Sequence, residues 1–210
     1  MFEYHLVDIE MKTIISILLT LLVLFLIYAL VLNIKEPIEF AEVKGIRKAK
    51  VVHSLEHIRT AQEVYKLVTG EYAHNFDTLN QVLRTDSIRI VTIFGDKDDL
   101  KSTEEFREVI TYKNALDSFN NTFLRKEQEV PNLDSLRFVP YTDGEVYTMS
   151  ADTLTYQSTL VNVVEVSTRW KNFMGEYASP RYKKFDNSYD PNKVIKFGDM
   201  SAPNLAGNWR

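Results

Sequence analysis

The stretch TIISILLTLLVLFLIYALVL, from Thr13 to Leu32, contains twenty residues and no charged side chain. As an α-helix it would be about 30 Å long, which matches the hydrocarbon thickness of a bilayer. A buried helix of a soluble domain is rarely apolar on every face over such a length. The stretch therefore predicts a transmembrane helix, anchored by Ile14, Leu18, Leu22, Phe25 and Tyr28.

A cleaved signal peptide is the alternative interpretation of the same stretch. The apolar core of a signal peptide is usually about 7–15 residues long and ends at a small-x-small cleavage site. Here the run is longer, and the residues that follow it, NIKEP at 33–37, contain no such site. We therefore expect the helix to be retained as an anchor.

A second helical pattern follows the apolar stretch. Pro37 is expected to kink the helix or to restart it, because proline fits best in a first turn. Beyond it, apolar residues recur at steps of three and four and so share one face of an amphipathic helix. This face comprises Val51, Leu55, Ile58, Ala61, Tyr65 and Val68. Gly70 is expected to end this stem helix as a residue with positive φ.

The remainder of the chain mixes strand and helix patterns. Strands are predicted at 87–94, 153–157, 160–168 and 193–197, with a hairpin over 136–150 that turns at Asp143-Gly144. Ser102 and Glu105 form a capping box, which predicts a helix from Thr103 to about Phe123. Loops are expected after Trp170, apart from the strand at 193–197.

These elements predict an α+β fold. An N-terminal transmembrane helix would continue into a long amphipathic stem helix, packed on a mainly antiparallel sheet. The predicted parts are an N-terminal flank at 1–12, the transmembrane helix at 13–34, the stem helix at 35–70 and the α+β domain at 71–210.

Composition excludes several classes of function. The chain has 25 basic and 29 acidic residues, a net charge of −4, and so lacks the basic field that gathers nucleic acid. It contains no cysteine, which excludes disulfides, thiolate metal sites and cysteine nucleophiles. No phosphate-binding loop or nucleophile elbow is present, and no cofactor is expected.

Two clusters of residues are candidate metal sites. His53, Glu56 and His57 match the inverted zinc-peptidase motif H-x-x-E-H, in which two histidines bind Zn²⁺ and the glutamate serves as general base. Solvated polar residues at the edge of the stem explain the same pattern, and we prefer that interpretation. Asp96, Asp98 and Asp99 offer oxygen ligands for Ca²⁺, but their spacing departs from an EF-hand, and a solvated turn is preferred.

The stretch HIRTAQEVYKLVTGEYAHNFDTL, residues 57–79, resembles the end of the long first helix of type IV pilins and secretion-system pseudopilins. The matching residues are Ala61, Gln62, Tyr65, Gly70, Tyr72 and Leu79, and Pro37 stands 28 residues before Tyr65, as in pilins. Pilins carry a basic leader that ends in Gly and a glutamate near the start of the mature helix, and the sequence before and within the apolar stretch has neither that Gly nor that glutamate. Cleavage by a prepilin peptidase is therefore not expected.

The chain also resembles uncharacterised single-pass envelope proteins of Bacteroidetes. The likeness includes the stem, the VPYTDG stretch at 139–144 and the AGNW stretch at 206–209. This second resemblance covers more of the chain, but it implies no particular activity.

The pilin resemblance implies a non-enzymatic, pseudopilin-like subunit or scaffold of a secretion or filament-like envelope assembly. Such a protein acts by transmembrane helix packing and protein contacts. The expected partners are the lipid bilayer and other envelope proteins, in a hetero- or homo-oligomer, without nucleic acid. The expected location is the inner membrane, with the C-terminal domain in the periplasm.

Two alternatives remain open. Basic residues gather on the C-terminal side of the apolar stretch, and counted alone they favour a cytoplasmic domain that acts as an adaptor. These residues are Lys35, Lys44, Arg47, Lys48 and Lys50. The other alternative is a membrane-tethered zinc hydrolase that uses the HxxEH motif.

Overall fold

The computed structural model describes residues 2–94, 107–126 and 128–209. The chain divides into two compact units, one ending at Ile46 and the other beginning at Arg47. The first unit is helical throughout its described residues, and the second, called the head below, holds an α+β fold.

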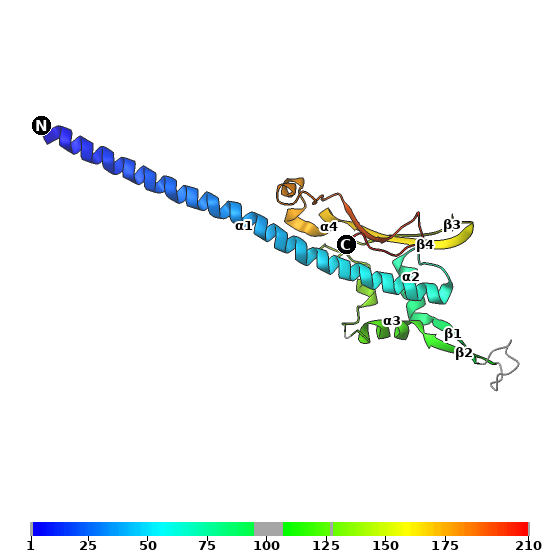
Figure 1. The fold of residues 1–210 in the computed structure, drawn as a ribbon. Helices are drawn as coiled ribbons and strands as arrows, with labels where there is room; N and C mark the ends of the chain where they lie inside the picture. The colour runs from blue at the N-terminus through cyan, green and yellow to red at the C-terminus, as the bar shows by residue number, and fades with distance from the viewer. Residues whose placement is uncertain (1, 95–106, 127, 210) are drawn as a thin grey trace. The chain divides into compact units, whose positions relative to one another are not determined.

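Helix α1 runs from Phe2 to Thr69 and contributes to both units (Figure 1). It continues through Pro37, so the predicted restart at this residue is wrong. A proline removes one helical hydrogen bond, a loss that a long helix with regular turns on both sides can absorb. The helix ends as predicted at Gly70, whose φ is +85° and whose N–H donates to the Lys66 carbonyl at 2.9 Å.

The head contains two antiparallel sheets. The first pairs β1 with β2, and the second has the strand order β3-β4-β5. The strands are β1 Ser87–Phe94, β2 Arg107–Asn114, β3 Thr148–Tyr156, β4 Thr159–Arg169 and β5 Val194–Gly198. The helices that accompany them are α2 Phe76–Thr85, α3 Ala115–Leu124, η1 Leu133–Ser135, α4 Trp170–Met174, η2 Gly175–Tyr177 and η3 Pro180–Lys184.

Strand β4 is the central strand of the three-stranded sheet, as its run of valines predicted. Val163, Val164 and Val166 are all buried. A two-residue turn joins β3 to β4, and both of its residues, Gln157 and Ser158, have positive φ. This backbone twist matches that of the paired strands.

The part of α1 within the head lies between the three-stranded sheet and a second layer that contains α3 and the β1–β2 hairpin (Figure 1). On the sheet side, the amide of Gln62 contacts the Met149 sulfur in β3 at 3.2 Å. On the other side, the ring of His57 packs edge-on against Phe123 in α3, with ring centroids 4.8 Å apart. The stem is therefore covered from two directions, rather than by one sheet alone.

The predicted helix from Thr103 to Phe123 is wrong over residues 107–114, which form strand β2. Val109, Ile110 and Thr111 are β-branched and pair with β1, so long-range strand pairing overrides the local helix signal. The helix begins only at Ala115, where the Asn114 side chain caps it by accepting from Leu116 N–H at 2.8 Å. The capping residues Ser102 and Glu105, and the turn predicted at 95–99, lie outside the described residues.

Two other predictions need correction. The hairpin over 136–150 is reduced to one isolated bridge between Phe138 and Val146, and the strand β3 begins only at Thr148. The region after Trp170, predicted as loops, contains the short helices α4, η2 and η3. The strands predicted at 87–94, 160–168 and 193–197 are confirmed, the last with bounds 194–198.

Candidate functional site

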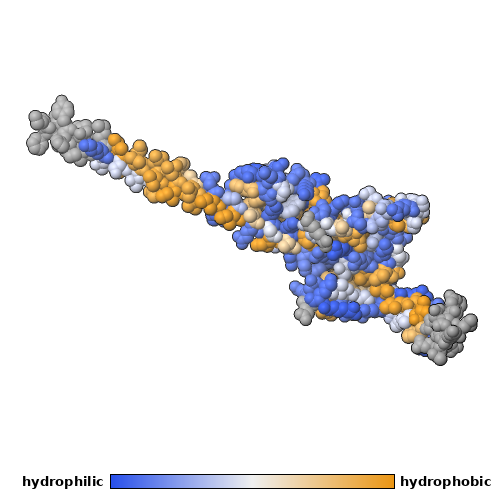
Figure 2. All heavy atoms as spheres, in the orientation of Figure 1, coloured by the Kyte–Doolittle hydropathy of each residue, from blue (hydrophilic) through white to orange (hydrophobic). Residues whose placement is uncertain are grey.

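The apolar part of α1 is exposed on all sides in the protein itself (Figure 2). Ile14, Leu18, Leu22, Phe25 and Tyr28 are all at least half exposed. The Thr20 hydroxyl donates to the Ser16 carbonyl at 2.9 Å, so this polar side chain is satisfied within its own helix. Among the described residues, α1 is the one helix that is long and apolar enough to span a membrane.

The apolar stripe of the stem has a different environment. Val51, Leu55, Ile58 and Ala61 are fully buried, whereas Tyr65 and Val68 are half-buried. The predicted stripe did not include Gln62 and Val64, both of which are buried. Because the end of α1 is covered from two directions, the buried face there is wider than a single stripe.

Gln62, near the end of α1, forms hydrogen bonds to the segment that follows the helix. Its amide donates to the Ala73 carbonyl at 3.0 Å, and its carbonyl oxygen accepts from Ala73 N–H at 2.9 Å. Both backbone groups of Ala73 are thereby paired inside the core, as buried polar groups require. The periodicity argument missed this residue because it counts only apolar side chains.

His53 and His57 lie one turn apart on α1, with ring centroids 4.1 Å apart. Burial, followed by the nearby charges of His53 and Lys50, lowers the pKa of His57 from 6.5 to about 4. His57 is therefore neutral at physiological pH. In the part of the chain that the structure describes, its buried Nε2 atom has no hydrogen-bond partner.

The histidine pair alone does not complete a zinc centre. A catalytic zinc site uses three protein ligands and leaves a fourth position open. Across residues 12–94, 107–126 and 128–209, no group of three or more His, Cys, Asp or Glu side chains is placed to hold a metal ion. His53 and His57 supply two neighbouring nitrogens, and the aspartates at 96, 98 and 99 lie outside the described residues.

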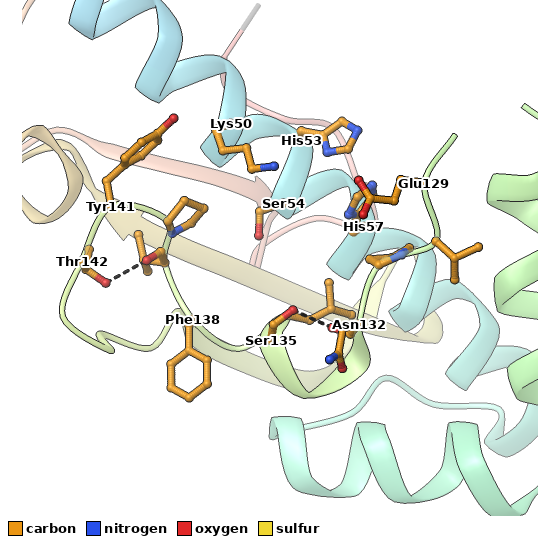
Figure 3. Close-up of a pocket in the computed structure, with 15 residues that line it drawn as sticks. Lys50, His53, Ser54, His57, Glu129, Asn132, Ser135, Phe138, Tyr141 and Thr142 are labelled. Carbon is orange, nitrogen blue, oxygen red and sulfur yellow. Dashed lines mark hydrogen bonds between the residues drawn. The ribbon is translucent and has the colours of Figure 1, made fainter. Parts of the chain in front are cut away.

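A cavity of about 520 Å³ lies between α1 and the segment 129–142 (Figure 3). Lys50, His53 and Ser54 line it from the helix, while Glu129 and Tyr141 line it from the segment. Tyr141 has a positive φ of 64°, uncommon for a bulky residue, and the Arg47 guanidinium lies 5.1 Å from its ring centroid. The lining mixes basic, acidic and aromatic groups and does not select one class of ligand.

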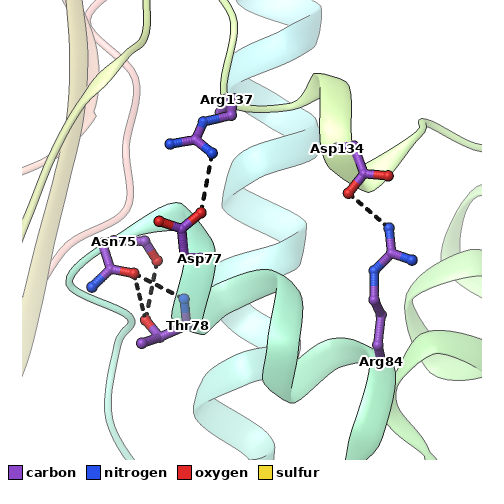
Figure 4. Close-up of polar contacts among 6 residues, drawn as sticks. All are labelled: Asn75, Asp77, Thr78, Arg84, Asp134 and Arg137. Atoms are coloured by element: carbon purple, nitrogen blue, oxygen red, sulfur yellow. Dashed lines mark hydrogen bonds and ion pairs between the residues drawn. The ribbon is translucent and has the colours of Figure 1, made fainter.

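Ion pairs attach this same segment to α2 (Figure 4). Arg84 contacts Asp134 at 2.9 Å, and Arg137 contacts Asp77 at 3.0 Å. Arg84, Asp134 and Asp77 are exposed and Arg137 is half-buried, so each pair contributes about 1 kcal/mol or less. The pairs join α2 to the segment that lines the cavity and contribute little to the stability of the head.

The β1–β2 hairpin carries exposed apolar side chains, visible as an orange region in Figure 2. They are Ile90, Val91, Ile93 and Phe94 on β1, and Val109, Ile110 and Tyr112 on β2. Sequence reasoning missed this surface because it predicted β2 as part of a helix. The alternating β-branched residues of REVITYKN, residues 107–114, were the available signal.

Comparison with known proteins gave no match to a protein-family model, to a curated protein or to a solved structure. The resemblance to pilins and to Bacteroidetes envelope proteins therefore rests on the residues quoted from the sequence.

Proposed function

We propose that the chain is a single-pass membrane protein that acts, without catalysis, as a pseudopilin-like subunit or scaffold of an envelope assembly. The apolar part of α1 would lie in the inner membrane, and the head would lie in the periplasm and contact other envelope proteins. No cofactor is required by this function.

The observation that carries the proposal is the exposure of every large apolar side chain between Ile14 and Val31. Soluble monomers rarely expose a contiguous apolar surface above a few hundred Å². A helix that is apolar all round has no polar face to turn toward water, whereas a bilayer covers it from all sides. The exposed apolar hairpin supports the second half of the proposal, because such patches mark interaction sites on soluble domains.

Protease accessibility in spheroplasts tests the location of the head. Digestion of the head by externally added protease, with protection in intact cells, is the expected result. Protection in spheroplasts with digestion only after lysis would place the head in the cytoplasm, as the basic residues beside the apolar stretch favour on their own.

In-cell cross-linking tests the assembly. The proposal expects cross-linked products that contain the chain and at least one further envelope protein or copy. Purification in mild detergent as a lone monomer, without any cross-linked neighbour in cells, would contradict an assembly function.

A further inference from the structure

The β1–β2 hairpin is a two-stranded sheet whose eight residue pairs run from Ser87↔Asn114 to Phe94↔Arg107. Among the described residues, no third strand joins it. An isolated two-stranded hairpin is marginally stable in water at best, and a third strand or a packed face is normally needed. The hairpin therefore offers two open strand edges for further pairing.

Both faces of this hairpin carry apolar side chains. Residues directly opposite one another across the pair share a face. Val91, Ile93, Ile110 and Tyr112 fall on one face, and Ile90, Phe94 and Val109 fall on the other. All seven are exposed, Tyr112 by 68%. A partner packed on one face would contact that face alone, whereas a strand added at the edge places its side chains beside the apolar residues of both faces.

The two edges differ in charge. Proteins commonly protect a strand edge from pairing with charged side chains. Strand β2 carries Arg107, Glu108 and Lys113. Strand β1 carries only Arg89 and has no charge from Ile90 to Phe94. The edge of β1 is therefore the one that is open to strand addition.

We propose that the edge of β1 pairs antiparallel with β1 of a second copy of the chain, giving a continuous sheet in the order β2-β1-β1-β2. The inference deepens the proposed assembly function by naming one partner. In antiparallel pairing, Arg89 of each copy lies near the apolar far end of the other strand. A parallel arrangement would instead place the two arginines opposite each other, which is unfavourable.

The segment that follows β1 in sequence also favours two antiparallel copies. Residues 95–106 contain five acidic and two basic side chains. Antiparallel pairing places the Phe94 ends of the two strands, after which these residues follow in sequence, at opposite ends of the contact, whereas parallel pairing would bring the two ends together. The same acidic residues disfavour an anionic lipid surface as the partner of the hairpin.

A cysteine scan of the full-length chain in mild detergent tests the contact, because the native chain has no cysteine to interfere. The β1 variants are Ile90→Cys, Val91→Cys and Thr92→Cys, and the matched β2 variants are Val109→Cys, Ile110→Cys and Thr111→Cys. Under mild oxidation, we expect a disulfide-linked dimer from at least one β1 variant, several-fold more abundant than from any β2 variant. Equal cross-linking on both strands, or none on β1, would overturn the proposal.

Two matched lysine variants provide an independent test that does not depend on disulfide geometry. Val91→Lys places lysines of both copies at the contact, whereas Val109→Lys adds the same charge to β2; the two valines are 39% and 41% exposed. Sedimentation in detergent should show a dimer dissociation constant about tenfold or more higher for Val91→Lys, and no such rise for Val109→Lys. Equal weakening by both variants, with unchanged circular dichroism, would contradict a contact through β1.

The results also separate this inference from the wider proposal. If the chain cross-links in cells to other envelope proteins but never to itself through β1, the homotypic contact is wrong and the assembly function stands. If no neighbour of any kind is found, both fail.

Discussion

Two parts of the same helix have opposite surroundings. Between Ile14 and Val31, α1 is apolar on every side and exposed. From residue 47 onward most of its apolar side chains form a buried stripe, and Glu63 and Leu67 are exposed on other faces. A protein core can cover one stripe, because the rest of the helix remains polar enough for water. An all-round apolar surface leaves no polar face for water, which is why we propose that a bilayer surrounds it. The comparison shows that the arrangement of apolar residues, more than their number, determines what covers a helix.

The largest expected effect comes from adding charge to the apolar part. The triple variant Leu18→Arg, Leu22→Arg and Phe25→Arg introduces three arginines near the centre of the predicted span. Each costs about 3 kcal/mol on membrane insertion, or roughly 9 kcal/mol together. We expect the protein to leave the membrane fraction, as measured by fractionation and immunoblotting. Unchanged membrane association would show that this part of α1 is not the anchor.

Truncation of the buried stripe should affect folding and leave membrane association intact. Leu55 is fully buried, so Leu55→Ala should lower the free energy of unfolding of the head by about 2–5 kcal/mol. Leu67 lies on the same helix but is 66% exposed, so Leu67→Ala should change the free energy of unfolding by less than about 0.5 kcal/mol. Urea unfolding of the full chain in detergent measures both. Similar losses for the two variants would contradict the buried stripe.

Removing the buried amide should have a smaller effect than removing the leucine. Gln62→Ala leaves the N–H and C=O groups of Ala73 without their present partner and should destabilise the head by about 2 kcal/mol. Gln62→Glu keeps an acceptor for Ala73 N–H but loses the donor to its carbonyl, and it buries a carboxyl group. Unfolding curves for both variants should therefore show a loss, and a neutral Gln62→Ala variant would argue against this arrangement.

The smallest effect concerns pH. The pKa of His57 is lowered from 6.5 to about 4 in the folded chain, so between these values the unfolded state binds more protons. The part of the head's stability that depends on neutral His57 is therefore fully present above pH 6.5 and is lost as the pH falls toward 4. In His57→Gln this dependence should flatten, whereas His53→Gln should retain most of it, because burial is the largest cause of the shift. Urea midpoints at pH 7 and pH 5 measure the difference, and identical slopes in the native chain and His57→Gln would contradict it.

Local sequence patterns were sufficient to predict elements whose structure depends on nearby residues alone. The apolar stretch, the end of α1 at Gly70 and the central strand β4 were all predicted from the sequence. Strand β2 was not, because its pairing with β1 is a long-range contact that a local capping signal does not contain. Similarly, the half-buried ring of His57 packs against Phe123, which lies 66 residues later in the chain. Gln62 is placed by hydrogen bonds to a turn that forms only after the helix ends.

The exposed hairpin depends on the same long-range pairing. Its apolar residues are spread over β1 and β2, and they form one surface only when the two strands lie side by side. The sequence alone therefore predicts the strand β1 but not the surface that it shares with β2.

Alkaline carbonate extraction of membranes that contain the full chain tests the central claim most directly. High pH releases peripheral proteins but leaves proteins that span the bilayer in the pellet. We expect the chain to remain in the pellet and a variant that lacks residues 13–32 to appear in the supernatant. Release of the full chain into the supernatant would contradict a membrane-spanning α1.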